Sequence, residues 1–323
     1  MHRRCGWTDY TKDDDIDVRF CFDRSSLSVP GSGARGHVCA PHRGLLREIS
    51  VPLHYAKAGH IATFTIENGP VNALTPNMHR ELHAALRDFL ADTEIRCGIL
   101  TGKGERAFCA GDDIKTPSAG PATPSGQLAR HLWPHSDEAG GADPVAWARD
   151  VLHLERFKPI IGAVSGWCLG QGMIYLLHLT DIRIAARNAQ FGFPEIAYQM
   201  ACAGGTTRLG RQIPHTAAMW MLLTGDAMGA EEALATNLVN RVVDQDHLMP
   251  TAIEVANRIA RHPPAAVRIE MEAYYRCMDM TRSEALAFTR TLYRLQRLGL
   301  DEADRQPLAS QFLYRSDQAR EPS

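Results

Sequence analysis

The feature that most constrains the fold is a nearly continuous apolar run over residues 159–164. A strand buried on both faces has this pattern, because helices cover both sides of a parallel sheet. Helical patterns separate it from further apolar strand patterns, which lie at residues 61–66, 97–101, 182–185 and 238–243. Strands that alternate with helices predict an α/β core. After residue 246 the pattern is helical, and a capping box at 281–284 begins a long helix that ends at Gly299.

Three regions follow from these patterns. Residues 1–50 show no clean period and predict a poorly ordered extension. The core is predicted over residues 51–245, and a helical oligomerisation module is predicted over residues 246–323. Within the core, the stretch 116–144 is rich in Pro, Ser, Ala and Gly and predicts a long mobile excursion, followed by a helix over 144–157.

A helix is expected to begin at Thr75, with Pro76 in its first position. Its buried stripe is Met78, Leu82, Leu86 and Phe89. His79 and His83 are spaced i, i+4, as in some zinc sites. No acid directly follows the first His and no third ligand is apparent, so the pair is predicted to flank the stripe near solvent, and no metal is expected.

Composition excludes several classes of protein. Lys+Arg 35 against Asp+Glu 37 gives a net charge of -2, which does not support nucleic-acid binding. No apolar run approaches the ~18 residues needed to span a bilayer. The eight cysteines form no CxxC pair, and the chain start lacks an apolar signal region. Scattered free thiols fit a reducing compartment, so a cytoplasmic location is expected.

A dinucleotide fingerprint is only superficially matched by Gly102, Gly104 and Ala107 after a strand. Pyrophosphate binding needs a helix to begin on those glycines. Here Phe108 and Cys109 lead to Gly111 and two aspartates, which is no helix start. A plain turn is therefore predicted, and no nicotinamide cofactor.

Three segments indicate chemistry when taken together. Residues 107–115 are small enough for close backbone approach to a ligand. Residues 165–172 form a glycine turn that enters a helix, whose N-terminus presents free N–H groups. Residues 191–195 place one acid, Glu195, after Pro194 and among aromatic neighbours, where the pKa of a carboxyl rises toward the working pH.

In this order and spacing, the three segments closely resemble the enoyl-CoA hydratase/isomerase family, the crotonase superfamily. The resemblance runs from about His54 to the C-terminus and includes residues 72–74 and 223–226. It implies a spiral of ββα repeats with C-terminal helices, assembled as a trimer or a dimer of trimers. It also implies an acyl-CoA substrate and no separate cofactor, with coenzyme A as part of the substrate.

The resemblance implies that two backbone N–H groups hold the thioester oxygen. The first maps onto Asp112, whose carboxylate must point away from the enolate to avoid opposing its charge. The second maps onto Gln171 or Gly172, because this chain has one extra residue before Asp181. Gly172 is preferred, since it has no side chain to obstruct the pocket.

The family's hydratases use two glutamates, of which the second maps onto Glu195. The first falls on Ile174 or Tyr175, and neither holds a carboxylate. One carboxylate is enough to move a proton between two carbons. The expected reaction is therefore double-bond isomerisation, with Glu195 as the single acid/base. Hydratase or lyase activity, thioester hydrolysis and a catalytically silent binding module are the alternatives.

Coenzyme A is expected to lie against the turn at residues 70–74 and the segment at residues 107–115, where the Lys115 ammonium would meet a phosphate. The residues that the resemblance assigns to this contact are Pro70, Val71, Ala73, Ala110, Asp113, Ile114 and Lys115.

Overall fold

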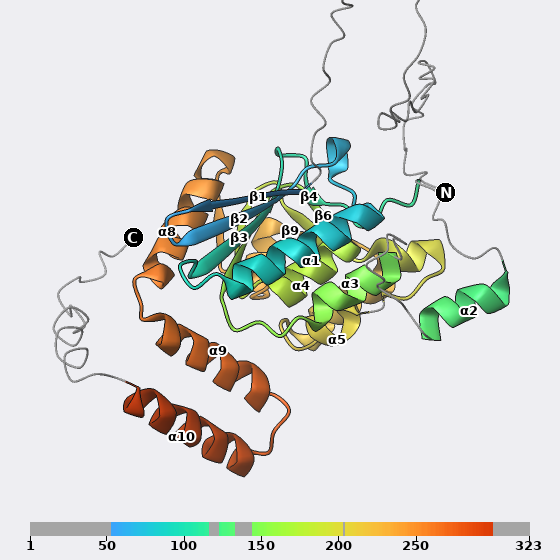
Figure 1. The fold of residues 1–323 in the computed structure, drawn as a ribbon. Helices are drawn as coiled ribbons and strands as arrows, with labels where there is room; N and C mark the ends of the chain where they lie inside the picture. Colours follow the sequence, from blue (N-terminus) through green and yellow to red (C-terminus); the bar gives the residue numbers. More distant parts are fainter. Residues whose placement is uncertain (1–52, 116–122, 133–143, 203, 300–323) are drawn as a thin grey trace, which may run out of the picture. The chain divides into compact units, whose positions relative to one another are not determined.

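The computed structural model describes residues 53–115, 123–132, 144–202 and 204–299 (Figure 1). The predicted extension 1–50 lies outside them. The strands are β1 (Leu53–Ala58), β2 (Ile61–Ile66), β3 (Cys97–Gly102), β4 (Ala107–Cys109), β5 (Ile160–Val164), β6 (Trp167–Leu169), β7 (Ile182–Ala186), β8 (Gln190–Gly192), β9 (Met228–Gly229) and β10 (Arg241–Val243). The α-helices are α1 (Pro76–Ala91), α2 (Pro124–Leu132), α3 (Pro144–His153), α4 (Gln171–Leu179), α5 (Gly205–Leu209), α6 (His215–Thr224), α7 (Ala230–Ala235), α8 (Leu248–Ala260), α9 (Pro264–Cys277) and α10 (Arg282–Leu298). Short 3-10 helices are η1 (Gly69–Val71), η2 (Pro194–Tyr198) and η3 (Gln245–His247).

The strands form two sheets that the chain visits alternately. The larger sheet has the order β1-β2-β3-β5-β7-β10 and the smaller one β4-β6-β8-β9. Each of β3, β5 and β7 is followed at once by a strand of the smaller sheet, and the chain then returns. All neighbours are parallel except the two pairs at the ends, β1 with β2 and β8 with β9. The predicted α/β spiral is confirmed.

Glycine makes the step from one sheet to the other possible. A Cβ at Gly102, the end of β3, would lie 2.3 Å from the Phe108 carbonyl oxygen. A Cβ at Gly166, between β5 and β6, would lie 2.0 Å from the Arg106 oxygen, and its φ is +61°. Only glycine fits such approaches, and they bring successive turns of the spiral into contact.

Helices cover both faces of the larger sheet. One face packs with α1 and α4 in the main apolar core, where Phe64, Phe89 and Tyr175 are fully buried. The other face packs under α8 through Leu248, Ala252 and Ala256. β5 is buried along its whole length, as its apolar run predicted. α8 thus packs on the core sheet, and it is the first helix of the region 246–323 that was predicted as a helical oligomerisation module.

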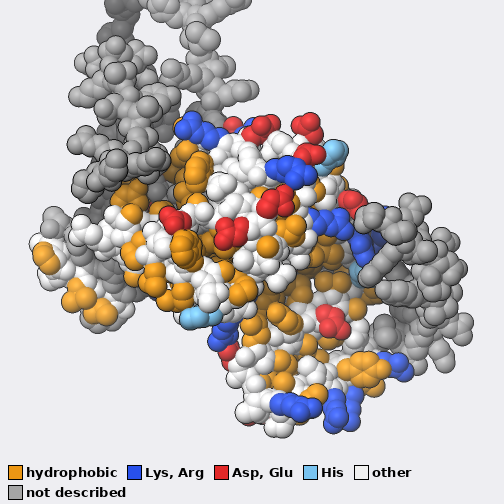
Figure 2. Space-filling view, turned by 180° about the vertical axis from the view of Figure 1, so that it is seen from behind, with side chains coloured by type: hydrophobic (Ala, Val, Ile, Leu, Met, Phe, Trp, Pro, Cys, Tyr) orange, Lys and Arg blue, Asp and Glu red, His pale blue; other side chains and the backbone are white. Residues whose placement is uncertain are grey.

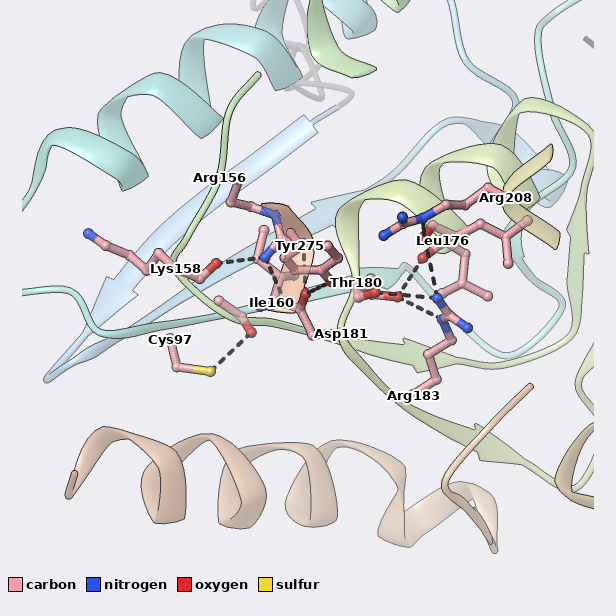
Figure 3. A network of polar contacts seen from close by, with 12 residues as sticks. Cys97, Arg156, Lys158, Ile160, Leu176, Thr180, Asp181, Arg183, Arg208 and Tyr275 are labelled. Carbon is pink, nitrogen blue, oxygen red and sulfur yellow. Dashed lines mark hydrogen bonds and ion pairs between the residues drawn. The ribbon is translucent and has the colours of Figure 1, made fainter. Parts of the chain in front are cut away.

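A buried polar cluster joins α9 to the core (Figure 3). Arg156 donates to both carboxylate oxygens of Asp181, at 2.6 and 3.0 Å. Asp181 also accepts from the Ile160 N–H at 2.8 Å and from the Tyr275 hydroxyl on α9. Neither α9 nor α10 has a buried residue. This cluster, which we call the α9 anchor, is therefore a main attachment of α9.

Several expected boundaries were wrong. The sequence missed β1, an edge strand in which only Leu53 is buried. The helix expected over 144–157 ends at His153, and the strand expected over 238–243 begins at Arg241. The excursion expected over 116–144 contains α2, and its residues 116–122 and 133–143 lie outside the described ones. None of the described helices is long and apolar enough to cross a membrane.

Candidate active site

Two glycine turns from neighbouring strands of the smaller sheet meet at their carboxyl ends. Gly111 follows β4 with φ +101°, and Gly170 follows β6 with φ +53°. A Cβ at Gly111 would lie 3.5 Å from the Gln171 nitrogen and 3.7 Å from the Gly170 Cα. The structure therefore brings together the first two of the three segments that the sequence singled out.

The hydrogen bonds of its neighbours hold the backbone at Asp112. Leu74 and Asp112 form an isolated parallel bridge: the Leu74 N–H donates to Gly111 at 2.8 Å and the Asp113 N–H to Leu74 at 2.9 Å. In a parallel bridge the central residue's N–H points away from the partner strand. Among the described residues, no backbone acceptor takes the Asp112 N–H.

Gln171 and Gly172 differ in what they face. Gln171 is the first residue of α4, next to Gly111, and its side-chain Nε2 is buried without a hydrogen-bond partner among the described residues. Gly172 packs against β4, since a Cβ there would lie 2.4 Å from the Cys109 oxygen. The position of Gln171 favours its N–H as the second donor over the Gly172 N–H that the sequence analysis preferred.

Glu195 reaches the same turns from the third segment. It lies in η2, directly after Pro194, and Phe193 beside it is buried. Its Oε1 is 3.3 Å from the position of a Cβ at Gly170, while Oε2 is buried with no partner in the described residues. Burial raises the pKa of this carboxyl, and the negative Asp112 carboxylate adds to the effect.

The two positions that lack the first glutamate point in different directions. Ile174 is buried near Gly204, where a Cβ would be 3.9 Å from the Ile174 Cγ2. Tyr175 is fully buried, and its hydroxyl lies 2.6 Å from His79 Nδ1. Tyr175 therefore packs in the core and also makes a polar contact through its hydroxyl.

The prediction that His79 flanks the stripe near solvent was wrong. His79 is only 1% exposed, and its Nε2 is 3.2 Å from Asp112 Oδ1. α3 packs along α1, and Tyr175 of α4 closes the other side, so α1 is buried on more than one stripe. His83 is partly buried beside Trp147, at 5.3 Å between ring centroids. No signal in the sequence pairs His79 with Tyr175, because they are 96 positions apart.

The segments assigned to coenzyme A lie side by side. The Ala110 N–H donates to Val71 at 3.0 Å, and the Asn68 side chain donates to Ala73 at 2.5 Å. Pro70 lies in η1, and Asp113 accepts from the Lys115 N–H at 2.9 Å. Ile114 is 79% exposed, and Lys115 is exposed as well. The structure therefore presents these seven residues around one edge of the glycine turns.

Burial makes the Cys109 thiol near the site a poor nucleophile. Cys109 is fully buried, and burial raises its pKa to about 12, so it carries almost no thiolate at neutral pH. Among the described residues, no group of three His, Cys, Asp or Glu side chains forms a metal site.

Comparison with known proteins decides the family. The model of a family described as enoyl-CoA hydratase/isomerase matches residues 56–298, which is most of the chain. The chain belongs to the enoyl-CoA hydratase/isomerase family. It is therefore an acyl-CoA-processing enzyme of this family, which acts on acyl-CoA thioesters.

Relatives and solved structures agree with this assignment. Carnitinyl-CoA dehydratase of Shigella flexneri is 33% identical over 244 residues, covering 75% of this chain and 87% of the relative. (E)-benzylidenesuccinyl-CoA hydratase of Thauera aromatica is 32% identical over 251 residues, covering 76% and 91%. The crystal structure of enoyl-CoA hydratase from Bacillus anthracis has a TM-score of 0.67 at 29% identity, covering 75% of this chain and 90% of that one. An enoyl-CoA hydratase/isomerase from Mycobacterium paratuberculosis has a TM-score of 0.64 at 29% identity, covering 80% and 94%.

Proposed function

We propose that this enzyme adds water reversibly to the double bond of an enoyl-CoA thioester, with Glu195 moving the proton at Cα. The observation that carries the proposal is the Glu195 carboxyl beside two glycine turns, which has a raised pKa and one oxygen with no partner in the described part of the chain. A general acid/base works best when its pKa is near the operating pH. The relatives named a dehydratase and a hydratase favour water addition and removal.

The backbone N–H groups of Asp112 and Gln171 would hold the thioester oxygen. Both belong to the turns that meet at Gly111 and Gly170. Charge develops on that oxygen when a proton leaves or reaches Cα, and preorganised donors stabilise it there. The first residue of α4 adds the positive end of the helix dipole.

Coenzyme A would lie along residues 70–74 and 110–115, with the exposed Lys115 ammonium as a phosphate partner. Calorimetry with acetyl-CoA should give binding that weakens as salt rises, because exposed charge pairs are screened. If the salt dependence of the affinity is unchanged in a Lys115→Ala variant, Lys115 does not contact the coenzyme A phosphates.

Double-bond isomerisation is the second candidate. The observation that favours it is the absence of an acid at both Ile174 and Tyr175. Isomerisation needs a single proton carrier, and Glu195 is available for that role.

One panel experiment separates the candidates. The enzyme is incubated with enoyl-CoA thioesters that differ in chain length and double-bond position. Hydration gives a product heavier by one water, isomerisation gives equal mass with a moved double bond, and thioester hydrolysis releases a free thiol. The Glu195→Gln protein is the matched control, because it keeps the shape of the side chain and removes the base. An absence of all three products, with coenzyme A ester still bound, would support a silent binding module instead.

A further inference from the structure

A chain of three polar side chains runs from inside the core to the candidate site. The Tyr175 hydroxyl is 2.6 Å from His79 Nδ1, and His79 Nε2 is 3.2 Å from Asp112 Oδ1. The three residues come from α4, from α1 and from the turn after β4. The three side chains thus meet from three different elements of the fold.

Burial gives the chain a direction. Tyr175 is 0% and His79 1% exposed, whereas the Asp112 side chain is 54% exposed. Two of the three groups are therefore closed to substrate, and Asp112 is the end that substrate and water can reach. Asp112 is also the residue directly after Gly111, at the edge of the site.

The contacts order the atoms of the chain. The His79 ring meets Asp112 through Nε2, which is 3.2 Å from Oδ1, and it meets the Tyr175 hydroxyl through Nδ1, at 2.6 Å. A carboxylate only accepts hydrogen bonds, so a proton shared between this ring and Asp112 is carried on Nε2. Burial and the negative Asp112 carboxylate raise the pKa of Tyr175 well above its usual value, which keeps that hydroxyl protonated.

We propose that the Asp112 carboxylate is the second proton-transfer group of the reaction, positioned by His79, which Tyr175 holds in turn. The role rests on the proposed hydration. It supplies the second acid that neither Ile174 nor Tyr175 provides, from a different element of the fold.

The step balances as follows. Asp112 takes a proton from water while the water oxygen forms a bond to Cβ of the enoyl thioester. The electron pair of the double bond moves through Cα to the thioester oxygen, which the two N–H donors stabilise. The enolate then takes a proton at Cα from the protonated Glu195. Asp112 returns its proton to Glu195 through solvent, so one water is consumed and nothing else.

This order also answers a problem of charge. A negative Asp112 close to the enolate would oppose the charge that develops there. Once Asp112 has taken the water proton, it is neutral at the stage when the enolate exists. The contact with His79 further draws the carboxylate toward α1.

The test compares two activities of the same protein. Exchange of the Cα protons of butyryl-CoA with deuterated water needs Glu195 and the N–H donors, but no attack by water. Hydration of crotonyl-CoA needs Asp112 as well. Asp112→Asn keeps the backbone N–H and the side-chain shape, and should lower the ratio of hydration to exchange by roughly 10²–10⁴-fold. Asp88→Asn is the matched control, because this α1 carboxylate is also 54% exposed but lies outside the site, and it should leave that ratio unchanged.

The positioning residues are tested by rescue. His79→Leu should lower the hydration kcat by roughly 10- to 100-fold with little change in KM, since the polar contact that positions the Asp112 carboxylate is lost. His79→Gln, which offers an amide N–H in place of Nε2–H, should recover part of that loss. Tyr175→Phe should cost less than His79→Leu.

Each result has a separate meaning. Equal losses of hydration and exchange in Asp112→Asn, or normal hydration, would overturn the role of Asp112 and leave the proposed function standing. A wild type that exchanges Cα protons but hydrates no enoyl-CoA would overturn the proposed function, and this role with it. His79→Gln no better than His79→Leu, with both folded, would show that His79 is only a packing residue.

Discussion

Two buried polar clusters of this molecule differ in how completely their atoms are paired. In the α9 anchor, both oxygens of Asp181 accept hydrogen bonds, from Arg156, Tyr275 and a backbone N–H. At the glycine turns, Glu195 Oε2 and Gln171 Nε2 are buried without partners among the described residues. Buried polar groups are normally paired.

We expect this contrast to separate a structural role from a catalytic one. The paired cluster stabilises the fold and needs nothing further. The unpaired cluster leaves polar atoms, among them those of a carboxyl with a raised pKa, facing the space where a substrate would bind. Changes in the first should affect stability, and changes in the second should affect turnover.

Glu195→Gln should give the largest effect on catalysis. The substitution removes the proton carrier and keeps the shape, so turnover should fall by roughly 10²–10⁴-fold while coenzyme A esters still bind. Steady-state kinetics and calorimetry on the same protein check this, and its unfolding midpoint should not fall. Turnover within a few-fold of wild type would mean that another residue is the base.

Asp181→Asn should give the largest effect on stability. Arg156, whose side chain is 7% exposed, would remain charged in the core without a carboxylate, which costs about 3–5 kcal/mol. Urea unfolding gives the loss in free energy, and kcat per folded molecule should stay near that of wild type. Tyr275→Phe, which removes one neutral donor from the same cluster, is the control and should cost less. A small loss for Asp181→Asn would show that α9 unfolds locally in the variant and lets water reach the Arg156 guanidinium.

The sequence predicted the fold because its strands have strong local signals. The apolar run of β5 and the glycine turns after β4 and β6 lie within short windows of sequence. β1 was missed because only one of its residues is buried, so it has almost no apolar period. α2 was missed because its sequence lies in a stretch rich in turn-forming residues.

The site was predicted where it rests on backbone turns and missed where it rests on helix packing. Gly111, Gly170 and Glu195 are brought together as expected. His79 was placed near solvent because the period of α1 gives a single stripe, whereas α3 and α4 bury a wider face. Which helices pack there depends on tertiary contacts, and no local pattern carries that information.

Gln171→Pro tests the second backbone donor. Proline is tolerated at the first position of a helix and lacks an N–H, so the change removes the donor and leaves α4 intact. We expect a loss of roughly 10²–10³ in kcat. Gln171→Ala keeps the N–H and serves as the control. If Gln171→Pro keeps a kcat near that of Gln171→Ala and of wild type, the donor is the Gly172 N–H. Equal losses in both variants would assign the effect to the Gln171 side chain instead.

Assembly concerns the region beyond the α9 anchor. α10 exposes Leu286 and Tyr293, one stripe of the helix, and Leu298 is 83% exposed; apolar side chains also lie open on the face in Figure 2. We expect the C-terminal helices, from about residue 246, to drive trimer formation. Light scattering should give a multiple of three protomers, and Leu286→Glu should lower the assembled fraction, whereas Arg290→Glu at an exposed polar position should not. A stable monomer at micromolar concentration would contradict this.

The smallest effect expected is on the pH dependence of stability at Glu195. Its pKa in the folded protein is raised above the ordinary 4.5 by burial. Between these two values the unfolded chain releases the proton and the folded chain keeps it, so stability falls as pH rises through this window. Above the folded pKa the difference no longer changes. Glu195→Gln has no proton to release, so the free energy of unfolding of wild type relative to the variant should decline from about pH 4 upward and then level off. Because the carboxyl is only partly buried, solvent screening keeps the decline small, and urea titrations at matched ionic strength are needed to resolve it. A difference that rises with pH would mean that Glu195 is stabilised in its charged form, and the assignment of Glu195 as a base with a raised pKa would then be wrong.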